Sequence, residues 1–427
     1  MHSKQDSTTA TSVATALNVQ NNYMTAGQQI KITGFFICLI WLCLSTTADA
    51  AEWSGNISAQ SRHFLHASSP VNAGQHDNYL SLTAEPEFYH RWDDEQQSIT
   101  FTPFYRYDQH DQQRTHGDIR ELVWLKTFDN WELKAGISKV FWGVTESQHL
   151  VDIINQTDFV ENIDGEDKLG QPMIKTSIER DWGLIDFFIL PGFRQRTYAG
   201  IEGRPRSTAI VLTDLTQYES ADKERHIDYA LRWFNTLGQW DIGLSHFKGT
   251  SREPILQPTL IATFPPTVIP YYPQMEQTGI DLQATIEDWL WKLEIINRHW
   301  LNDHFYAATA GFEYTLIGLF DTDTDLGIVA EYLYDNRDQY LTTFFEHDLM
   351  LGLRLVLNDE QSTEALFGFI IDQDSHETLM SLEASRRIGN NWKIELETRL
   401  FQHIDKTGFL NMFNKDDFVQ LNLSYYF

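Results

Sequence analysis

The chain is almost without cysteine. Its 427 residues include only two, Cys38 and Cys43, and both lie in one apolar run near the N-terminus. Once that run is removed no thiol remains, which excludes a disulfide framework and a cysteine metal site. A chain without thiols also suits a protein that crosses an oxidising compartment in an unfolded state.

Basic residues are scarce as well. There are 32 lysines and arginines against 60 acidic residues, and the formal net charge is −28. This balance excludes nucleic acid as a partner, because binding a polyphosphate requires a basic surface. It fits a surface or a lumen that attracts cations. A linker is also lacking, so we expect one domain over 51–427, although a soluble chain of this length would normally divide.

Long apolar runs are missing, with one short exception. Gly34–Leu44 is apolar, follows Lys31 and precedes Ala48-Asp49-Ala50, which is an A-x-A cleavage pattern. The run is too short for a transmembrane helix, which needs about 20 residues. A basic flank, a short apolar core and small residues at the cut predict a secretory signal peptide.

We therefore expect residues 1–50 to comprise an N-terminal extension and a cleaved signal peptide. Met24 would begin a signal of ordinary length and is the alternative start of the protein. The mature chain is expected to begin at Ala51 or close to it. Leu42 stands before Cys43 where a lipoprotein signal would need a small residue, so lipidation is not expected.

The mature chain does have a period of two. In Asp348–Asn358 the odd positions are all leucine, and the other face carries Asp348, Gly352, Arg354 and Asn358. In Phe418–Phe427 one face is formed by Val419, Leu421, Leu423, Tyr425 and Phe427. This alternation predicts β-strands with one apolar and one polar face. A soluble sandwich alternates too, so other features must decide between the two folds.

Turn length alternates along the chain. Short turns are expected near Asp93-Asp94, Asp129-Asn130, Arg180-Asp181, Thr236-Leu237, Asp288, Asp321–Asp325, Asn358–Glu360 and Gly389–Asn391. Longer loops are expected between them, near 64–77, 108–117, 143–171, 192–225, 249–275, 335–344 and 404–416. Outer-membrane barrels have this asymmetry. It predicts an all-β, antiparallel, up-and-down transmembrane barrel of about 18 strands, with 16 as the alternative, and both termini in the periplasm.

Aromatic side chains support a membrane barrel. Tryptophans lie beside the short turns, at Trp92, Trp131, Trp182, Trp240, Trp289, Trp291 and Trp392, and Tyr105, Tyr107, Tyr332 and Tyr334 could form the opposite girdle. Such rings favour the bilayer surface, where carbon is buried and the polar group stays wet. In hydrocarbon all backbone groups must be paired, so only helices or closed sheets span it.

The C-terminal residues QLNLSYYF, with Tyr425 and the terminal Phe427, resemble the assembly signal of bacterial outer-membrane proteins. Asn422 departs from that pattern, which usually has glycine there. From the signal peptide to Phe427 the chain resembles the bacterial outer-membrane porin class, and Lys139–Gly143 (KVFWG) with the VTESQHLVDIINQTD that follows is similar to uncharacterised proteobacterial members. The resemblance implies an outer-membrane location, contact with lipid and lipopolysaccharide, recognition of the last strand by the barrel assembly machinery, and passive diffusion.

Residues 143–171 form the most informative loop. It is long, partly apolar and rich in acid, with Glu146, Asp152, Asp158 and Glu161 among its carboxylates. One interpretation is a segment folded into the lumen as a pore constriction whose acids favour cations. The other is an outer loop whose acids face water.

Two further loops have unusual compositions. Residues 192–206 carry the basic set Arg194, Arg196, Arg204 and Arg206. These side chains could face the acidic loop across the pore or bind an anionic group, or they could contact lipopolysaccharide phosphates or solvent. Residues 254–273 contain six prolines among apolar residues. That loop could cover the barrel mouth, dip into the membrane or receive an apolar substrate, or it is simply packed and stiffened by proline.

Inward charges at Glu294, Glu331, Arg354, Glu395 and Arg399 are expected on a wet lumen wall. No catalytic residue, metal site or cofactor is expected, and the chain is not expected to be an enzyme. The leading hypothesis is a porin-like channel for small hydrophilic solutes, biased towards cations. The alternative is a substrate-specific transporter or exporter of hydrophobic or lipid-like molecules. The oligomeric state is left open.

Overall fold

The computed structural model describes residues 51–68, 74–260, 263, 265–301, 303–337, 343–405 and 409–427. The predicted N-terminal extension and signal peptide, residues 1–50, lie outside the described residues. Eighteen strands form one sheet. The predicted strand number is therefore confirmed.

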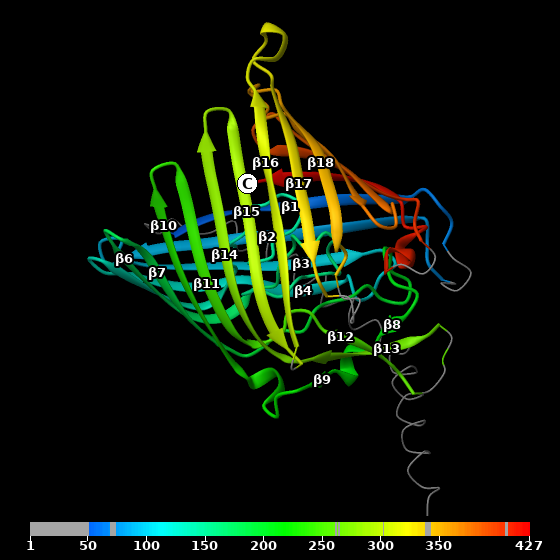
Figure 1. The fold of residues 1–427 in the computed structure, drawn as a ribbon, viewed down its shortest axis with the longest axis horizontal. Coiled ribbons are helices and arrows are strands. Elements are labelled where there is room, and N and C mark those ends of the chain that lie inside the picture. The colour runs from blue at the N-terminus through cyan, green and yellow to red at the C-terminus, as the bar shows by residue number, and fades with distance from the viewer. Residues whose placement is uncertain are drawn as a thin grey trace, which may run out of the picture.

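The eighteen strands pair antiparallel, each with the next barrel strand along the chain (Figure 1). Their bounds are β1 (Ala51–Phe64), β2 (Asn78–Trp92), β3 (Gln97–Asp108), β4 (His116–Thr127), β5 (Trp131–Ser138), β6 (Gln171–Arg180), β7 (Gly183–Pro191), β10 (Ile227–Leu237), β11 (Trp240–Thr250), β14 (Gln274–Ile286), β15 (Trp289–Trp300), β16 (Asp303–Leu316), β17 (Asp325–Asp335), β18 (His347–Val356), β19 (Glu364–Asp372), β20 (Thr378–Ile388), β21 (Trp392–Gln402) and β22 (Phe418–Tyr426).

The last strand closes the sheet on the first. β22 pairs with β1 over nine residue pairs, from Asn56 opposite Tyr426 to Phe64 opposite Phe418. The N–H of Phe427 donates to the carbonyl of Gly55 at 3.1 Å, at the same end of the barrel as the short turns. Closure leaves no free sheet edge. The predicted up-and-down barrel is confirmed.

The two ends of the barrel differ in the length of their connections. At one end the turns are short, as between β10 and β11 or β20 and β21. At the other end lie the long connections 65–77, 139–170, 192–226, 251–273 and 403–417. Two connections at this second end, 301–302 and 373–377, are also short, which the sequence patterns did not predict.

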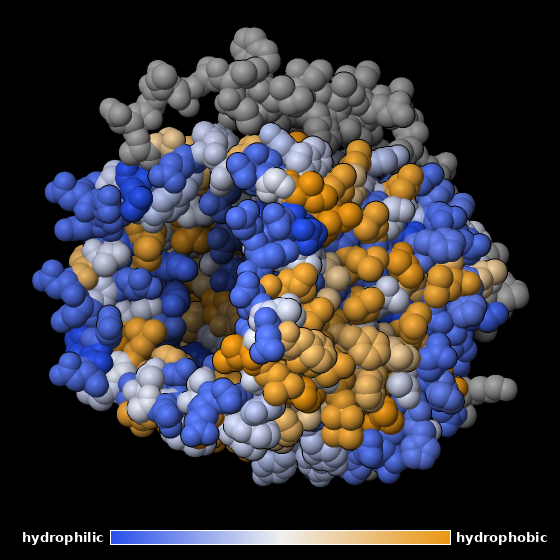
Figure 2. All heavy atoms as spheres, turned by 90° about the horizontal axis from the view of Figure 1, so that it is seen from above, coloured by the Kyte–Doolittle hydropathy of each residue, from blue (hydrophilic) through white to orange (hydrophobic). Residues whose placement is uncertain are grey.

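The two faces of the wall differ as the alternation predicts. Outward positions leave large apolar side chains exposed, among them Leu80, Leu82, Leu231, Leu244, Leu353, Leu421 and Leu423. Inward positions carry buried charges such as Arg232 and Asp281, which form an ion pair at 2.7 Å between β10 and β14. Figure 2 shows the apolar area of the outer surface with hydrophilic residues around it, and a hollow beside it. An apolar belt on a closed sheet needs lipid around it.

A second, four-stranded sheet lies at the end of the barrel with the long loops (Figure 1). It comprises β8 (Ile210–Val211), β9 (Gln217–Tyr218), β12 (Ile255–Pro258) and β13 (Thr267–Tyr272). The proline-rich segment 254–273 thus pairs with the loop 192–226 through β13. Tyr272 is completely buried there, whereas Leu260 is fully exposed.

Short 3-10 segments complete the secondary structure: η2 (Thr213–Leu215), η3 (Lys223–Arg225), η4 (Leu319–Asp321) and η5 (Phe409–Phe413). Among the described residues, no helix is both long enough and apolar enough to cross a membrane.

Neighbouring positions on β22 test the assignment of faces. Leu421 faces outward, whereas Asn422 faces inward and donates to Glu395 at 2.8 Å. We expect Leu421→Arg to lower the free energy of unfolding by about 2–4 kcal/mol, because an arginine on the lipid face near mid-membrane costs this much. Asn422→Arg, the matched control, places its cation beside Glu395 and should change stability little. Denaturant unfolding in lipid vesicles measures both, and equal losses would contradict the assignment.

Candidate functional site

The connection between β5 and β6 folds into the barrel. Within residues 139–170, which we call the inner loop, Val151 and Ile154 are fully buried. They form one apolar cluster with inward side chains of five wall strands, Phe188, Ala230, Phe247, Met275 and Ile296. Because the loop and the wall shield each other from water, this contact holds the inner loop inside the lumen.

Two wall carboxylates hold the first half of the inner loop. Glu294, on β15, accepts three backbone N–H groups of the loop at 2.7–3.1 Å. Glu331, on β17, accepts the N–H groups of Glu146 at 2.7 Å and Ser147 at 2.8 Å. Hydrogen bonds to a charged acceptor contribute about 1.5–3 kcal/mol each. The path of the loop is therefore fixed by charges on the wall that faces it.

Arginines on the opposite side hold the second half of the loop. Arg106, on β3, donates to both carboxylate oxygens of Glu161, at 3.0 and 2.8 Å. Arg120, on β4, donates to Asp158 at 2.6 Å. Arg62 and Arg114 donate to backbone carbonyls of the same segment. Burial opposes ionisation of Glu161, but Arg106 and the hydrogen bond from His116 outweigh it and hold the pKa of Glu161 well below its usual value.

The structure separates the four loop acids that the sequence grouped together. Glu146 forms an ion pair with Arg354 of β18 at 2.6 Å, and Asp152 lies 3.2 Å from Lys168. Both line the cavity described below. Asp158 and Glu161 are buried against Arg120 and Arg106 and do not line the cavity.

The arginines of the loop 192–206 contact other residues of the protein. The predicted basic set is Arg194, Arg196, Arg204 and Arg206. Arg194 pairs with Asp118 of β4 at 2.8 Å. Arg204 is buried and pairs with Asp416 at 2.8 Å, and the other oxygen of Asp416 accepts the backbone N–H of Arg206 at 3.1 Å. Only Arg196 lines the cavity.

The predicted wall charges lie on inward faces. Glu294 and Glu331 bind the inner loop, Arg354 pairs with Glu146, and Arg399 of β21 pairs with Asp164 at 3.1 Å. Glu395 accepts from Asn422 on the same inward face. These five positions come from four different strands, and four of the five contact the inner loop directly.

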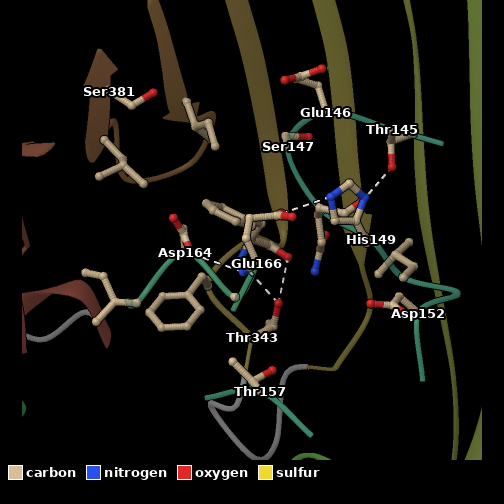
Figure 3. Close-up of a pocket in the computed structure, with 18 of the residues that line it drawn as sticks. Thr145, Glu146, Ser147, His149, Asp152, Thr157, Asp164, Glu166, Thr343 and Ser381 are labelled. Atoms are coloured by element: carbon tan, nitrogen blue, oxygen red, sulfur yellow. Dashed lines mark hydrogen bonds and ion pairs between the residues drawn. The ribbon is translucent and has the colours of Figure 1, made fainter. Parts of the chain in front are cut away.

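The inner loop does not fill the barrel. A cavity of about 510 Å³ remains between the loop and the strands β18–β21. In Figure 3 the loop residues Glu146 and His149 lie to the right, Ser381 of β20 lies at the upper left, and Glu166 lies between them. Besides His149, the cavity is lined by six acidic residues and by six lysines or arginines.

Eight of these twelve charges belong to two groups. Arg196, Arg252, Arg298 and Arg337 gather near Glu253, whose carboxylate pairs with Arg298 at 2.8 Å and also with Arg337. Arg399 forms the second group with three carboxylates, Asp164, Glu383 and Glu397, at 3.1, 2.6 and 3.4 Å. The first group is net basic and the second net acidic, so the cavity has charge of opposite sign in different places.

His149 links the inner loop to the wall. Its Nε2 lies 2.9 Å from Glu166 and its Nδ1 lies 4.0 Å from Glu294. Burial lowers the pKa of His149, but the hydrogen bond to Glu166 and the negative charges of Glu166 and Glu294 outweigh this and raise the pKa to about 10. His149 is therefore a cation at neutral pH.

One cluster has the composition of a metal site. The side chains of His116, Asp158 and Glu161 bring ligand atoms within 4.8 Å of one another. The carboxylates of this cluster are already bound by Arg120 and Arg106, at 2.6 and 2.8 Å. Two guanidinium groups at this distance repel a metal ion, so we assign no metal site there.

Sequence reasoning missed the arginine wall, which comprises Arg62, Arg106, Arg114 and Arg120. The only signal was arginine at inward positions of β1, β3 and β4 and in the connection between β3 and β4, and nothing in the sequence pairs it with the inner loop. Sequence reasoning also missed His149, Arg298 and Arg337, whose ion pairs with Glu294 and Glu253 join segments far apart along the chain. The apolar inward residues of β18–β21 were a third omission. The sequence signal for these residues was a strand with apolar residues on both faces, as in residues 364–372.

No known protein family and no curated protein matches the chain. Among solved structures, the chain is similar to OmpT, an outer-membrane protein of Vibrio cholerae, with a TM-score of 0.44 and 10% identity over 90% of this chain and 99% of that one. It is also similar to a triple mutant of the Rhodopseudomonas blastica porin, with a TM-score of 0.43 and 10% identity over 88% of this chain and 100% of that one. At these values the fold of the chain rests on its own strand pairing.

The geometry of the chain defines its class. A closed antiparallel sheet of 18 strands, apolar outside and charged inside, is a porin-like β-barrel. Such a barrel resides in the bacterial outer membrane, where the apolar belt meets lipid and the closed sheet leaves no open edge.

Removal of a wall carboxylate should free the tip of the inner loop. In Glu331→Ala, the amides of Glu146 and Ser147 lose their acceptor, and we expect their hydrogen exchange to accelerate by a factor of about 10 to 100. Glu395→Ala is the matched control, because Glu395 is an inward carboxylate that binds Asn422 and not the loop. Equal acceleration in both variants would contradict the anchoring role.

The raised pKa of His149 predicts a pH dependence of the inner loop. The stabilisation from the charged ring is complete below about 6.5, the pKa of an unfolded histidine, and is lost as pH rises through about 10. NMR titration of ring-labelled histidine should show one signal with a midpoint near 10 that disappears in His149→Asn. A midpoint near 6.5 for that signal would refute the proposed ion pairs.

Proposed function

We propose that the protein is an outer-membrane channel for passive diffusion of small hydrophilic solutes, and that it prefers cations. The observation that supports this most directly is the cavity of about 510 Å³ beside the inner loop. A lumen that is narrowed and still holds space lined by charged groups suits hydrated solutes of limited size. In this proposal the long loops lie at the cell surface and the short turns in the periplasm.

The proposed cation preference is supported by the charge of the whole chain. The formal net charge is −28, and a surplus of carboxylates raises the local concentration of cations at the entrances. The cavity itself has acidic and basic residues in equal number, so we expect the preference to be modest. The separation of basic and acidic groups also supports passage of dipolar solutes, which such a field would orient.

Planar bilayers test this function. The purified protein should give ohmic conductance, and the reversal potential across a salt gradient should indicate preference for K⁺ over Cl⁻. Absence of any conductance, or a preference for anions, would contradict the proposal.

A double variant tests where the selectivity arises. Asp164→Asn with Glu166→Gln removes two carboxylates that line the cavity, and we expect the cation-to-anion permeability ratio to fall roughly threefold, as two charges about 8 Å from a permeating ion in water imply. The control, Asp93→Asn with Asp94→Asn, removes the same charge at a short turn. If the control lowers the ratio as much as the cavity variant does, the cavity does not determine selectivity.

A further inference from the structure

An apolar row crosses the inner face of the wall. By strand register, Met350 of β18 lies opposite Ile370 of β19, Ile370 opposite Leu379 of β20, and Leu379 opposite Phe401 of β21. All four side chains line the cavity. We call these four residues the apolar row. The apolar inward side chains of β7, β10, β11, β14 and β15 are covered by the inner loop, whereas the apolar row borders the cavity.

The ends of the row are covered and its middle is open. Met350 is buried with Val329 and Leu333, and Phe401 is buried with Leu410 and Phe413. Ile370 and Leu379 are only half-buried. Apolar side chains that stay exposed to a wet cavity cost free energy in proportion to the area left in water. An apolar ligand over the middle of the row would remove that area from water.

Small residues leave space beside the row. The next inward row consists of Gly352, Gly368 and Ser381, again paired by register. Gly368 has no left-handed backbone conformation, and a Cβ there would meet nothing closer than 3.4 Å. The packing of the protein therefore does not require glycine at this position. The atoms nearest to such a Cβ are the methyl group of Met350 and the hydroxyl of Ser381, and Gly368 and Ser381 both line the cavity beside Ile370 and Leu379.

The acidic group borders this space. Ser381 lies opposite Arg399, and Leu366 lies opposite Glu383. Arg399 is shared by three carboxylates, so one positive charge faces three negative ones and the group retains two negative charges. A bound cation at this border would supply a missing counter-charge.

We propose that the apolar row and the Arg399 group form a binding site for organic cations that combine one ammonium group with a compact apolar body. The apolar body lies over Ile370 and Leu379 in the space left by Gly368 and Ser381, and the ammonium group lies towards Glu383. The inference rests on the proposed channel function and specifies a class of solutes that the channel retains during passage.

Current block in planar bilayers tests the site. The probes are 2-phenylethylammonium and ethanolammonium, which carry the same charge and differ in apolar surface. We expect the first to block K⁺ current reversibly, at a concentration at least about tenfold lower than the second, as burial of a phenyl ring implies. Equal block by the two probes would overturn the site and leave the channel function intact.

Three variants locate the block. Ile370→Ser with Leu379→Ser should weaken block by 2-phenylethylammonium about tenfold and leave that by ethanolammonium unchanged. Ser381→Leu should weaken it as well, by filling the space with an added apolar side chain that does not remove the row. Glu383→Gln should weaken block by both cations, whereas its matched control Glu364→Gln, a wall carboxylate that does not line the cavity, should not. An unchanged block in the first two variants would refute the site.

Calorimetry separates the failure of the site from the failure of the channel. Titration of the purified protein in detergent with the same two ammonium salts measures binding whether or not current flows. Selective binding of 2-phenylethylammonium without conductance would support the site and contradict the channel. No selectivity between the two salts in the titration would overturn the site even if the channel conducts.

Discussion

Closure of the sheet is the constraint on which the rest of the structure depends. β22 pairs with β1, so each of the 18 strands has partners on both sides and the sheet presents no open edge to lipid. Once the ring is closed, the outward residues must be apolar. The inward residues are then free to carry charge, and those charges position the inner loop through Glu294 and Glu331 on one side and Arg106 and Arg120 on the other.

The sequence was sufficient for the wall because the signal there is local. A period of two over ten residues, as in Asp348–Asn358, shows both the strand and its outward face without knowledge of its neighbours. Turn lengths gave the strand number in the same way. The two short connections at the opposite end, 301–302 and 373–377, were not predicted, because short turns were expected at one end only. The signal peptide remains a prediction.

The site was predictable only in part because its contacts are not local. The loop 143–171 was selected for its acids, but Asp158 and Glu161 proved to serve as anchors to arginines some 40 to 55 residues away. Which strands face a loop across a lumen depends on barrel circumference and stagger, and a single sequence contains neither. The apolar row is similar, because Met350, Ile370, Leu379 and Phe401 belong together only through register. Each of them looks ordinary in its own strand.

The inner loop has a consequence for the order in which the molecule is built. Its buried residues contact β7, β10, β11, β14 and β15, all of which follow the loop along the chain, while Glu161 faces β1 and β3, which precede it. The buried contacts of the inner loop are therefore complete only when wall strands from both sides of it in the sequence are in place, so folding of the loop and closure of the wall depend on each other.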